Sequence, residues 1–344
     1  MRGVGATVTQ KKLCFLWFDD DEARVEKYRG AIENADFEGF RRASLEVIAV
    51  TGPVVDEIAP LEQRTRRPDL IIMDHIFSRA RGATLKLNGA SAAHLVRRIW
   101  PDVPIICVTA MLPGKPKKLD QEDLSEYIAT YGYGALGDQL ETAFAIATDF
   151  KLLLARRGNY RRQLVDRLKP PTVERESLMR ALPSEFRSQT HATTQHRVAR
   201  WVLGVLMERP GFLYDRIRAA TLVGLSEVGF SKVENLFQPA LYDGPFATIC
   251  RPLWWVRELT QIVFAKSQDT SAGTAQLAGR SLEGIGSGDH SKCYVNAPPG
   301  DIPDVVARLA PSTEVHAVAS KHTRRDPEDV AALPGFETLL VIGD

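Results

Sequence analysis

The 344-residue sequence has few cysteines, no long hydrophobic run and almost no net charge. Its four cysteines (Cys14, Cys107, Cys250 and Cys293) are scattered, which excludes a disulfide framework and is typical of a reduced compartment. No run reaches about 18 apolar residues, and residues 1–10 lack the apolar segment of a signal peptide, so we expect neither a membrane span nor secretion. The net charge of +1 gives no global attraction to nucleic acid or to a membrane surface. These absences predict a cytoplasmic protein.

A chain of 344 residues is too long for one compact core and suits two or three domains. Its hydrophobic share of 44% and charged share of 25% are ordinary for globular proteins. The pair Pro170-Pro171 stops a helical pattern and marks a boundary. The Ser-, Gly-, Ala- and Thr-rich stretch 267–288 reads as a linker or flexible loop. We therefore expect an α/β domain at 10–150, a helical linker at 151–171, a helical domain at 172–266 and a small α/β unit at 267–344. The last two can also form one domain.

The N-terminal part alternates short apolar runs with amphipathic helical patterns. The runs predict buried strands, and they lie at 13–18, 45–50, 70–73, 103–108 and 124–130. Helical patterns fall between them, at about 22–34, 53–60 and 90–99. Alternation of this kind with short connections predicts a five-stranded, doubly wound parallel sheet.

Carboxylates follow two of these predicted strands. The first strand ends on Asp19, Asp20 and Asp21, and the third ends on Asp74. Because the carboxyl ends of parallel strands share one edge of a sheet, where ligands collect, we expect these side chains to lie close together. Clustered carboxylates hold their charge most easily around a cation. The alternative for the first group is that it only caps the helix that follows.

These features resemble the receiver domain of two-component response regulators, over roughly residues 12–150. The resemblance implies the flavodoxin-like receiver fold. The matching positions are the metal-binding acidic pair Asp19 and Asp20, the phosphoacceptor Asp74, Gly89 at the start of a helix, the hydroxyl residue Thr109 after the fourth strand and the aromatic switch residue Tyr127 on the fifth.

The resemblance also implies a chemistry. Asp19 or Asp20, Asp74 and the backbone carbonyl of Ile76 would hold Mg²⁺. The Thr109 hydroxyl would bind a phosphoryl oxygen, and its movement would leave room for Tyr127 to turn inward.

The sequence departs from the family pattern in two ways. The family places a Lys near the end of the fifth strand, and counting from Tyr127 puts Thr130 at that position. The loop after Asp74 is long and basic, so an Arg of this loop (Arg79 or Arg81) either replaces the Lys or is simply solvated. The domain is thus either an atypical phosphorylated receiver or a pseudo-receiver that binds a partner without phosphate.

The second half resembles no family that we recognise. A loose helix-turn-helix pattern surrounds Gly224, but its second helix carries Glu227 and Glu234 against one Lys232, which does not favour DNA binding. Three short strands are expected at 292–295, 314–319 and 338–342, with a helix at 302–309.

His290, Cys293, His316 and His322 form the one grouping of metal-capable residues in the C-terminal part, and their spacing fits no zinc module. A nucleophilic Cys293 paired with His316 or His322 is an alternative, and so are ordinary surface histidines beside a buried cysteine.

The leading hypothesis is a bacterial two-component signalling protein. A sensor histidine kinase or phosphotransfer protein would phosphorylate Asp74 with Mg²⁺, and the C-terminal half would be an output or interaction domain, with a homodimer as a further partner. The alternatives are a pseudo-receiver adaptor or phosphate sink, a DNA-binding response regulator and a receiver-gated enzyme using Cys293. Beyond self-phosphorylation and dephosphorylation of the receiver, we expect no enzymatic activity unless Cys293 supplies one.

Overall fold

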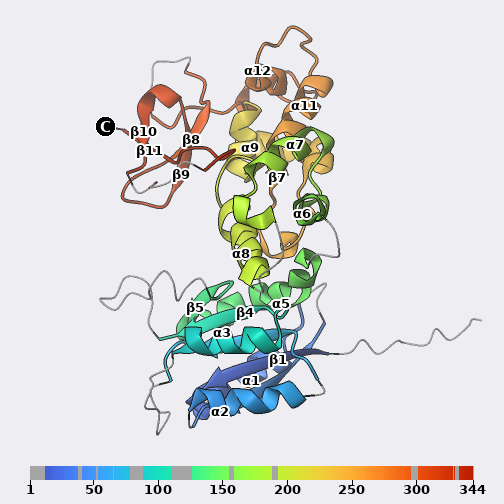
Figure 1. Ribbon diagram of the computed structural model, residues 1–344. Helices are drawn as coiled ribbons and strands as arrows, with labels where there is room; N and C mark the ends of the chain where they lie inside the picture. The colour runs from blue at the N-terminus through green and yellow to red at the C-terminus, as the bar shows by residue number, and fades with distance from the viewer. Residues whose placement is uncertain are drawn as a thin grey trace, which may run out of the picture. The chain divides into compact units, whose positions relative to one another are not determined.

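In the computed structural model, the chain forms two compact units (Figure 1). The first comprises Met1–Gly158 with Ser188–Arg200, and the second comprises Asn159–Arg187 with Trp201–Asp344. The structure describes residues 12–37, 41–51, 53–64, 66–77, 88–110, 126–154, 159–187, 193–295, 301–327, 329 and 333–343. Within these ranges, every helix is too short or too polar to cross a lipid bilayer.

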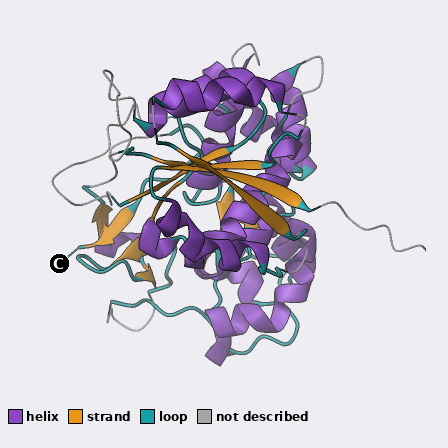
Figure 2. Ribbon diagram, turned by 90° about the horizontal axis from the view of Figure 1, so that it is seen from below, coloured by secondary structure: helices purple, strands orange, loops and turns teal. Residues whose placement is uncertain are grey.

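A parallel five-stranded sheet forms the centre of the first unit, and its strands fan out with the usual twist (Figure 2). The strands are β1 (Leu13–Asp19), β2 (Ala43–Ala49), β3 (Leu70–Asp74), β4 (Ile105–Thr109) and β5 (Thr130–Gly132). Their order is β2-β1-β3-β4-β5, all neighbours being parallel. This is the flavodoxin-like order, so the predicted doubly wound sheet is confirmed.

Helices cover both faces of this sheet because side chains along a strand alternate in direction. From β1, Leu16 and Phe18 belong to the cluster that contains α2 and α3 residues, including Ile58 and Val96. On the other face, Phe15 packs edge-on against Phe144 of α5, with ring centroids 4.9 Å apart. The helices are α1 (Glu22–Glu33), α2 (Val54–Ile58), α3 (Gly89–Ile99) and α5 (Leu140–Asp149).

The fifth strand begins later than its predicted range of 124–130. Pairing with β4 runs from Thr130, opposite Cys107, to Gly132, opposite Thr109. Tyr127 therefore precedes the strand instead of lying on it. Tyr127 and Ile128 are buried, and the amide of Ile128 already donates a hydrogen bond to the Ile105 carbonyl of β4 at 2.9 Å.

The second unit has a helical part with its own core. Its main helices are α6 (Tyr160–Leu168), α7 (Thr172–Ala181), α9 (Arg216–Leu222), α10 (Glu227–Val233), α11 (Val256–Lys266) and α12 (Ala275–Arg280), while α8 (Thr193–Trp201) contains the boundary between the units. A short antiparallel pair joins β6 (Leu213–Tyr214) to β7 (Trp254–Trp255). Ala278 and Leu282 are buried in the same core as Phe230 and Trp254. The prediction of a linker or flexible loop at 267–288 is therefore wrong, because small residues there allow close helix packing.

A four-stranded mixed sheet forms the C-terminal part. Its order is β10-β11-β8-β9, formed by β8 (Val305–Arg308), β9 (Val315–Val318), β10 (Thr323–Arg325) and β11 (Leu340–Ile342). The predicted helix at 302–309 is wrong, because the β-branched pair Val305-Val306 lies in β8 and pairs with β9. The predicted strand at 292–295 is also absent from the described residues; there, Tyr294 donates one backbone hydrogen bond to Ala317. The overall fold class, an α/β sheet followed by a helical region and a small sheet-containing unit, is confirmed.

Candidate functional site

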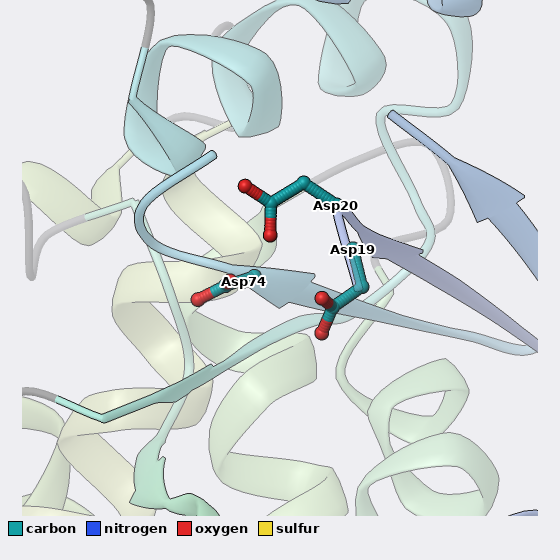
Figure 3. Close-up of side chains that lie close together, drawn as sticks. All are labelled: Asp19, Asp20 and Asp74. Carbon is teal, nitrogen blue, oxygen red and sulfur yellow. The ribbon is translucent and has the colours of Figure 1, made fainter. Parts of the chain in front are cut away.

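Three carboxylates meet at the carboxyl edge of the parallel sheet (Figure 3). Asp19 ends β1 and Asp74 ends β3, the strand paired directly with β1. Asp20 follows Asp19, and each of the three offers an oxygen within 4.8 Å of the others. Parallel pairing of two strands that both end on aspartate produces this convergence.

Burial makes the cluster electrostatically costly. Asp19 is 0% exposed and Asp74 is 2% exposed, and the Asp20 side chain is also buried. Burial, followed by repulsion from Asp19, raises the pKa of Asp74 from 3.8 to about 7. Burial also raises the pKa of Asp19, against hydrogen bonds from Tyr133 and the Asp21 amide. Buried carboxylates held this close together are stabilised by a bound cation or by protonation.

The acidic run divides between capping and the site. Asp21 is the N-cap of α1, and its side chain accepts a hydrogen bond from the backbone amide of Arg24 at 3.2 Å. Its own amide donates to Oδ1 of Asp19 at 2.8 Å. The capping alternative thus describes Asp21, while Asp19 and Asp20 face Asp74.

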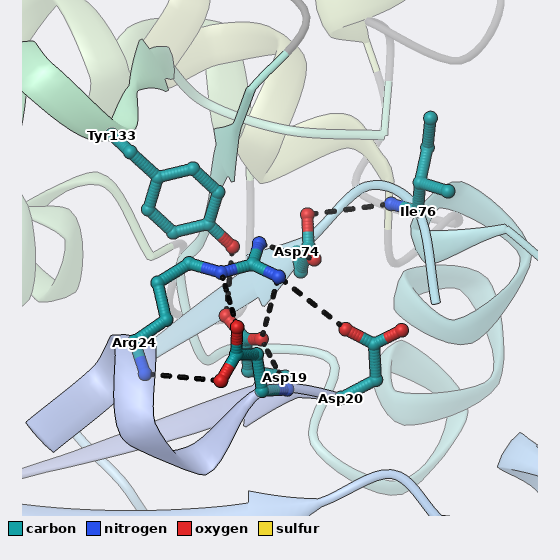
Figure 4. Close-up of polar contacts among 7 residues, drawn as sticks. Asp19, Asp20, Arg24, Asp74, Ile76 and Tyr133 are labelled. Atoms are coloured by element: carbon teal, nitrogen blue, oxygen red, sulfur yellow. Dashed lines mark hydrogen bonds and ion pairs between the residues drawn. The ribbon is translucent and has the colours of Figure 1, made fainter. Parts of the chain in front are cut away.

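Arg24 is the residue that sequence reasoning missed (Figure 4). From the first turn of α1, its guanidinium donates to Oδ2 of Asp74 at 3.2 Å. The same group lies 3.8 Å from Oδ1 of Asp19, 3.6 Å from Oδ1 of Asp20 and 3.5 Å from Oδ2 of Asp21. The only signal in the sequence is spacing, because a residue four positions after Asp20 can fold back over it from a helix.

Tyr133 occupies the place beside the cluster at the end of β5. Its hydroxyl donates to Oδ2 of Asp19 at 2.7 Å, and its ring lies under the Arg24 guanidinium, 4.5 Å from Cζ to the centroid. Thr130, which the count from Tyr127 assigns to the family Lys position, is the first residue of β5. Arg79 and Arg81 lie outside the described residues.

The other predicted site residues lie around Asp74. The amide of Ile76 donates to Oδ1 of Asp74 at 3.4 Å. Thr109 is buried at the end of β4, one residue beyond Val108, which pairs with Asp74. The prediction that Thr109 shares this edge with the carboxylates therefore agrees with the strand register.

Tyr127 is already buried, with 1% of its surface exposed. Its hydroxyl lies 3.4 Å from Nδ1 of His75, the residue after Asp74. Gly89, which begins α3, donates its amide to the His75 carbonyl at 2.7 Å. A side chain at Gly89 would have its Cβ 2.1 Å from the Asp74 carbonyl and 2.8 Å from the Tyr127 hydroxyl, so only glycine fits.

The C-terminal histidines and cysteine each have contacts with other residues. Cys293 accepts a hydrogen bond from the Ala319 amide at 3.3 Å, and His322 lies 3.2 Å from Asp301. His316 stacks on Tyr294, with centroids 3.7 Å apart, and the backbone of His290 forms an isolated bridge with Leu225. Among the described residues, the acidic cluster of Asp19, Asp20 and Asp74 is the one group of three metal-capable side chains.

Comparisons of the sequence with protein-family models and with curated proteins give no match. Comparison of the structure with solved structures gives receiver domains. One is the N-terminal domain of a response regulator/sensory box/GGDEF 3-domain protein from Carboxydothermus hydrogenoformans, with 17% identity and a TM-score of 0.30 over 39% of this chain and 92% of that one.

Two others are response regulator receiver domain proteins. The protein from Methanospirillum hungatei has 16% identity and a TM-score of 0.29 over 40% of this chain and 98% of its own. The protein from Clostridium thermocellum has 14% identity and a TM-score of 0.30 over 41% of this chain and 99% of its own. By its strand order and the aspartates at its carboxyl edge, the N-terminal unit of this chain has the receiver fold.

Proposed function

We propose that the chain is a two-component-type signalling protein in which the N-terminal receiver accepts a phosphoryl group on Asp74. The observation that carries this proposal is the meeting of Asp19, Asp20 and Asp74, whose oxygens lie within 4.8 Å of one another at the edge of a receiver-type sheet. Phosphoryl transfer to a carboxylate depends mainly on positioning and on neutralising charge, and this edge offers both.

The donor set fits Mg²⁺. All three side chains offer hard oxygen ligands, and their burial and mutual repulsion leave the cluster short of positive charge. Asp19, Asp20 and Asp74 would hold the ion, together with the backbone carbonyl of Ile76. When bound, Mg²⁺ would neutralise charge on the transferring phosphoryl oxygens.

Asp74 is the nucleophile of this proposal and must be ionised to attack. One oxygen, Oδ1, accepts the Ile76 amide, and the other, Oδ2, accepts from Arg24. These two contacts set the orientation of the carboxylate. The Thr109 hydroxyl, at the end of the next strand, is the group proposed to bind a phosphoryl oxygen.

The proposed switch joins Thr109 to Tyr127. Since Tyr127 is buried with its hydroxyl near His75, the expected change on phosphorylation is a rearrangement of an inward tyrosine. His75 directly follows Asp74 in the chain, and its ring contacts the Tyr127 hydroxyl. A phosphoryl group on Asp74 would therefore act on Tyr127 through the neighbouring residue.

The partner of the receiver would be a sensor histidine kinase or a phosphotransfer protein. The C-terminal unit would be the output or interaction domain, and a homodimer remains part of the proposal. The proposed domain organisation keeps the sequence-based segments: a receiver at 10–150, a helical linker at 151–171, a helical domain at 172–266 and a small α/β unit at 267–344. The last two would together form the output.

A pseudo-receiver adaptor or phosphate sink is the second candidate, and a specific observation favours it. Arg24 already supplies a positive charge to the carboxylates, and Tyr133 stands at the end of β5. A site that already contains a counter-charge can hold its conformation without phosphate.

The remaining alternatives have weaker support. A DNA-binding regulator needs a basic recognition helix, but on α10 Lys232 pairs with Asp289, and Arg216 of α9 pairs with Glu234. An enzyme using Cys293 needs a nearby base, whereas the contacts of Cys293 and His322 are with Ala319 and Asp301.

The experiment is phosphorylation by acetyl phosphate with Mg²⁺, followed by intact mass measurement of the full chain. The expected result is a single phosphoryl adduct that is lost in Asp74→Asn and retained in Asp243→Asn, a change at an exposed ion pair. Absence of an adduct, both here and with histidine kinases of the same source, would replace the proposal with the pseudo-receiver.

A further inference from the structure

Arg24 reaches four carboxylates from one position. Its guanidinium lies between 3.2 and 3.8 Å from oxygens of Asp19, Asp20, Asp21 and Asp74 (Figure 4). A planar group with five N–H donors can serve several acceptors at once, which a lysine ammonium does less well. One positive charge among four carboxylates leaves the cluster negative while Asp74 is ionised.

The guanidinium is held from its other side by Tyr133. The ring centroid lies 4.5 Å from Cζ of Arg24, and the Tyr133 hydroxyl is tied to Asp19 at 2.7 Å. The position of the cation is therefore defined by two elements, α1 and the end of β5, and is more than a loose surface ion pair.

A divalent ion would need the same oxygens. The metal-capable cluster consists of Asp19, Asp20 and Asp74, and Arg24 contacts all three. A guanidinium and a divalent cation repel each other, and both cannot lie against these oxygens at short range. We infer that Arg24 is an internal cation that occupies the acidic cluster and must leave it before a divalent ion can enter; this inference rests on the proposed metal-dependent function.

Arg24 can leave without unfolding its helix. The contact that begins α1 joins the Asp21 side chain to the backbone amide of Arg24, not to its guanidinium. The side chain of Arg24 is 24% exposed, so rotation about its side-chain bonds brings the charge to solvent. Binding of a metal ion is thereby coupled to the exposure of Arg24 beside α1. The ion replaces Arg24 as the partner of the three carboxylates.

The test is Mn²⁺ binding to the full chain, measured by electron paramagnetic resonance of the free ion, with Mg²⁺ as competitor. Arg24→Gln is expected to lower the Mn²⁺ dissociation constant about tenfold or more, because a competing charge is removed. Arg24→Lys keeps the charge and is expected to stay within about threefold of the wild type. Equal or weaker Mn²⁺ binding by Arg24→Gln would overturn the inference.

The matched control is Arg29→Gln. Arg29 lies on the same helix and is paired with Glu26 at 2.7 Å, away from the cluster, so its loss should leave Mn²⁺ affinity unchanged. A gain equal to that of Arg24→Gln would assign the effect to net charge and contradict displacement of Arg24.

A second measurement, by NMR, follows the Arg24 side chain in the wild-type protein and uses a variant only to assign its resonance. In the wild type, the Nε–Hε resonance of Arg24, identified by its absence in Arg24→Lys, should shift toward that of an exposed arginine as Mg²⁺ is added. An unchanged resonance while Mg²⁺ binds would overturn the inference.

The two proposals fail differently. If the wild type binds Mn²⁺ and is phosphorylated but Arg24→Gln binds no tighter, only the displacement by Arg24 is wrong. If Arg24→Gln binds tightly yet no variant is phosphorylated, the displacement holds and phosphorylation of Asp74 fails. If neither protein binds Mn²⁺, both the metal site and the displacement are wrong.

Discussion

The guanidinium of Arg24 lies 3.2 Å from Oδ2 of Asp74, so the first helix supplies a cation to the carboxylate that ends the third strand. Around this contact, Asp19 and Asp20 add negative charge and Tyr133 adds a hydrogen bond. The site therefore combines the acidic edge expected of a receiver with its own counter-charge. Its response to protons and to divalent ions should reflect both.

The stability of the protein should depend on pH through Asp74. Its pKa is about 7 in the folded protein against an ordinary value of 3.8, so the folded state binds this proton more tightly than the unfolded state. Ionised Asp74 therefore destabilises the folded state above pH 7, and this cost is relieved as the pH falls toward 4. In EDTA, the stability advantage of Asp74→Asn over the wild type should shrink by about 2 kcal/mol from pH 8 to pH 5.

Urea unfolding at the two pH values measures this difference. Asp243→Asn, at an exposed ion pair, is the control and should show the same difference from the wild type at both pH values. A pH-independent effect of Asp74→Asn would mean that the buried carboxyl does not titrate in this range.

Mg²⁺ should stabilise the protein more at pH 8 than at pH 6. Protonation of Asp74, whose pKa is about 7, removes one ligand from the cluster at the lower pH. With 10 mM Mg²⁺ (about the range that fills a weak site), the melting temperature should rise by about 2–5 °C at pH 8 and by less than half of that at pH 6. NaCl at equal ionic strength controls for screening, and an equal shift with NaCl would rule out a specific ion site.

Gly89→Ala should destabilise the N-terminal unit. The added Cβ would lie 2.1 Å from the Asp74 carbonyl, so the start of α3 must move away from the site. We expect a loss of at least about 2 kcal/mol in the free energy of unfolding, measured by chemical denaturation, together with weaker Mn²⁺ binding. Gly134→Ala is the matched control, because no atom lies within 4 Å of its added Cβ. Similar effects of both changes would contradict the close approach at Gly89.

Asp326→Ala should destabilise the C-terminal unit. Asp326 is 4% exposed and accepts two hydrogen bonds from Arg308 of β8, at 3.1 and 2.8 Å. Removing it leaves a partly buried guanidinium without this partner, at a cost of about 2–4 kcal/mol. Asp243→Ala breaks the exposed pair with Lys169 and should cost less than about 1 kcal/mol. Thermal unfolding of the full chain compares them, and equal losses would argue against the packing of β8 described above.

The predicted sheet and its acidic edge follow from local patterns. Apolar runs ending on Asp19 and Asp74 specify two buried strands, and alternation with helices requires these strands to be parallel. Parallel strands bring their carboxyl ends together, which is why Asp19, Asp20 and Asp74 could be placed in one cluster from the sequence. The segment of β8 (Val305–Arg308) was misread as part of a helix at 302–309 because its partner, β9, lies beyond it in the chain.

By itself, therefore, the sequence determined the strands of the receiver-type sheet and the carboxylates at its edge, because strand periodicity and strand ends are local properties. The tertiary structure alone decided what neutralises those carboxylates. Arg24 follows Asp20 by four positions, but nothing local marks it as the counter-charge of Asp74, and Tyr133 lies at the end of a different element. Their meeting over Asp19 depends on the packing of α1 and of the end of β5 against the sheet edge.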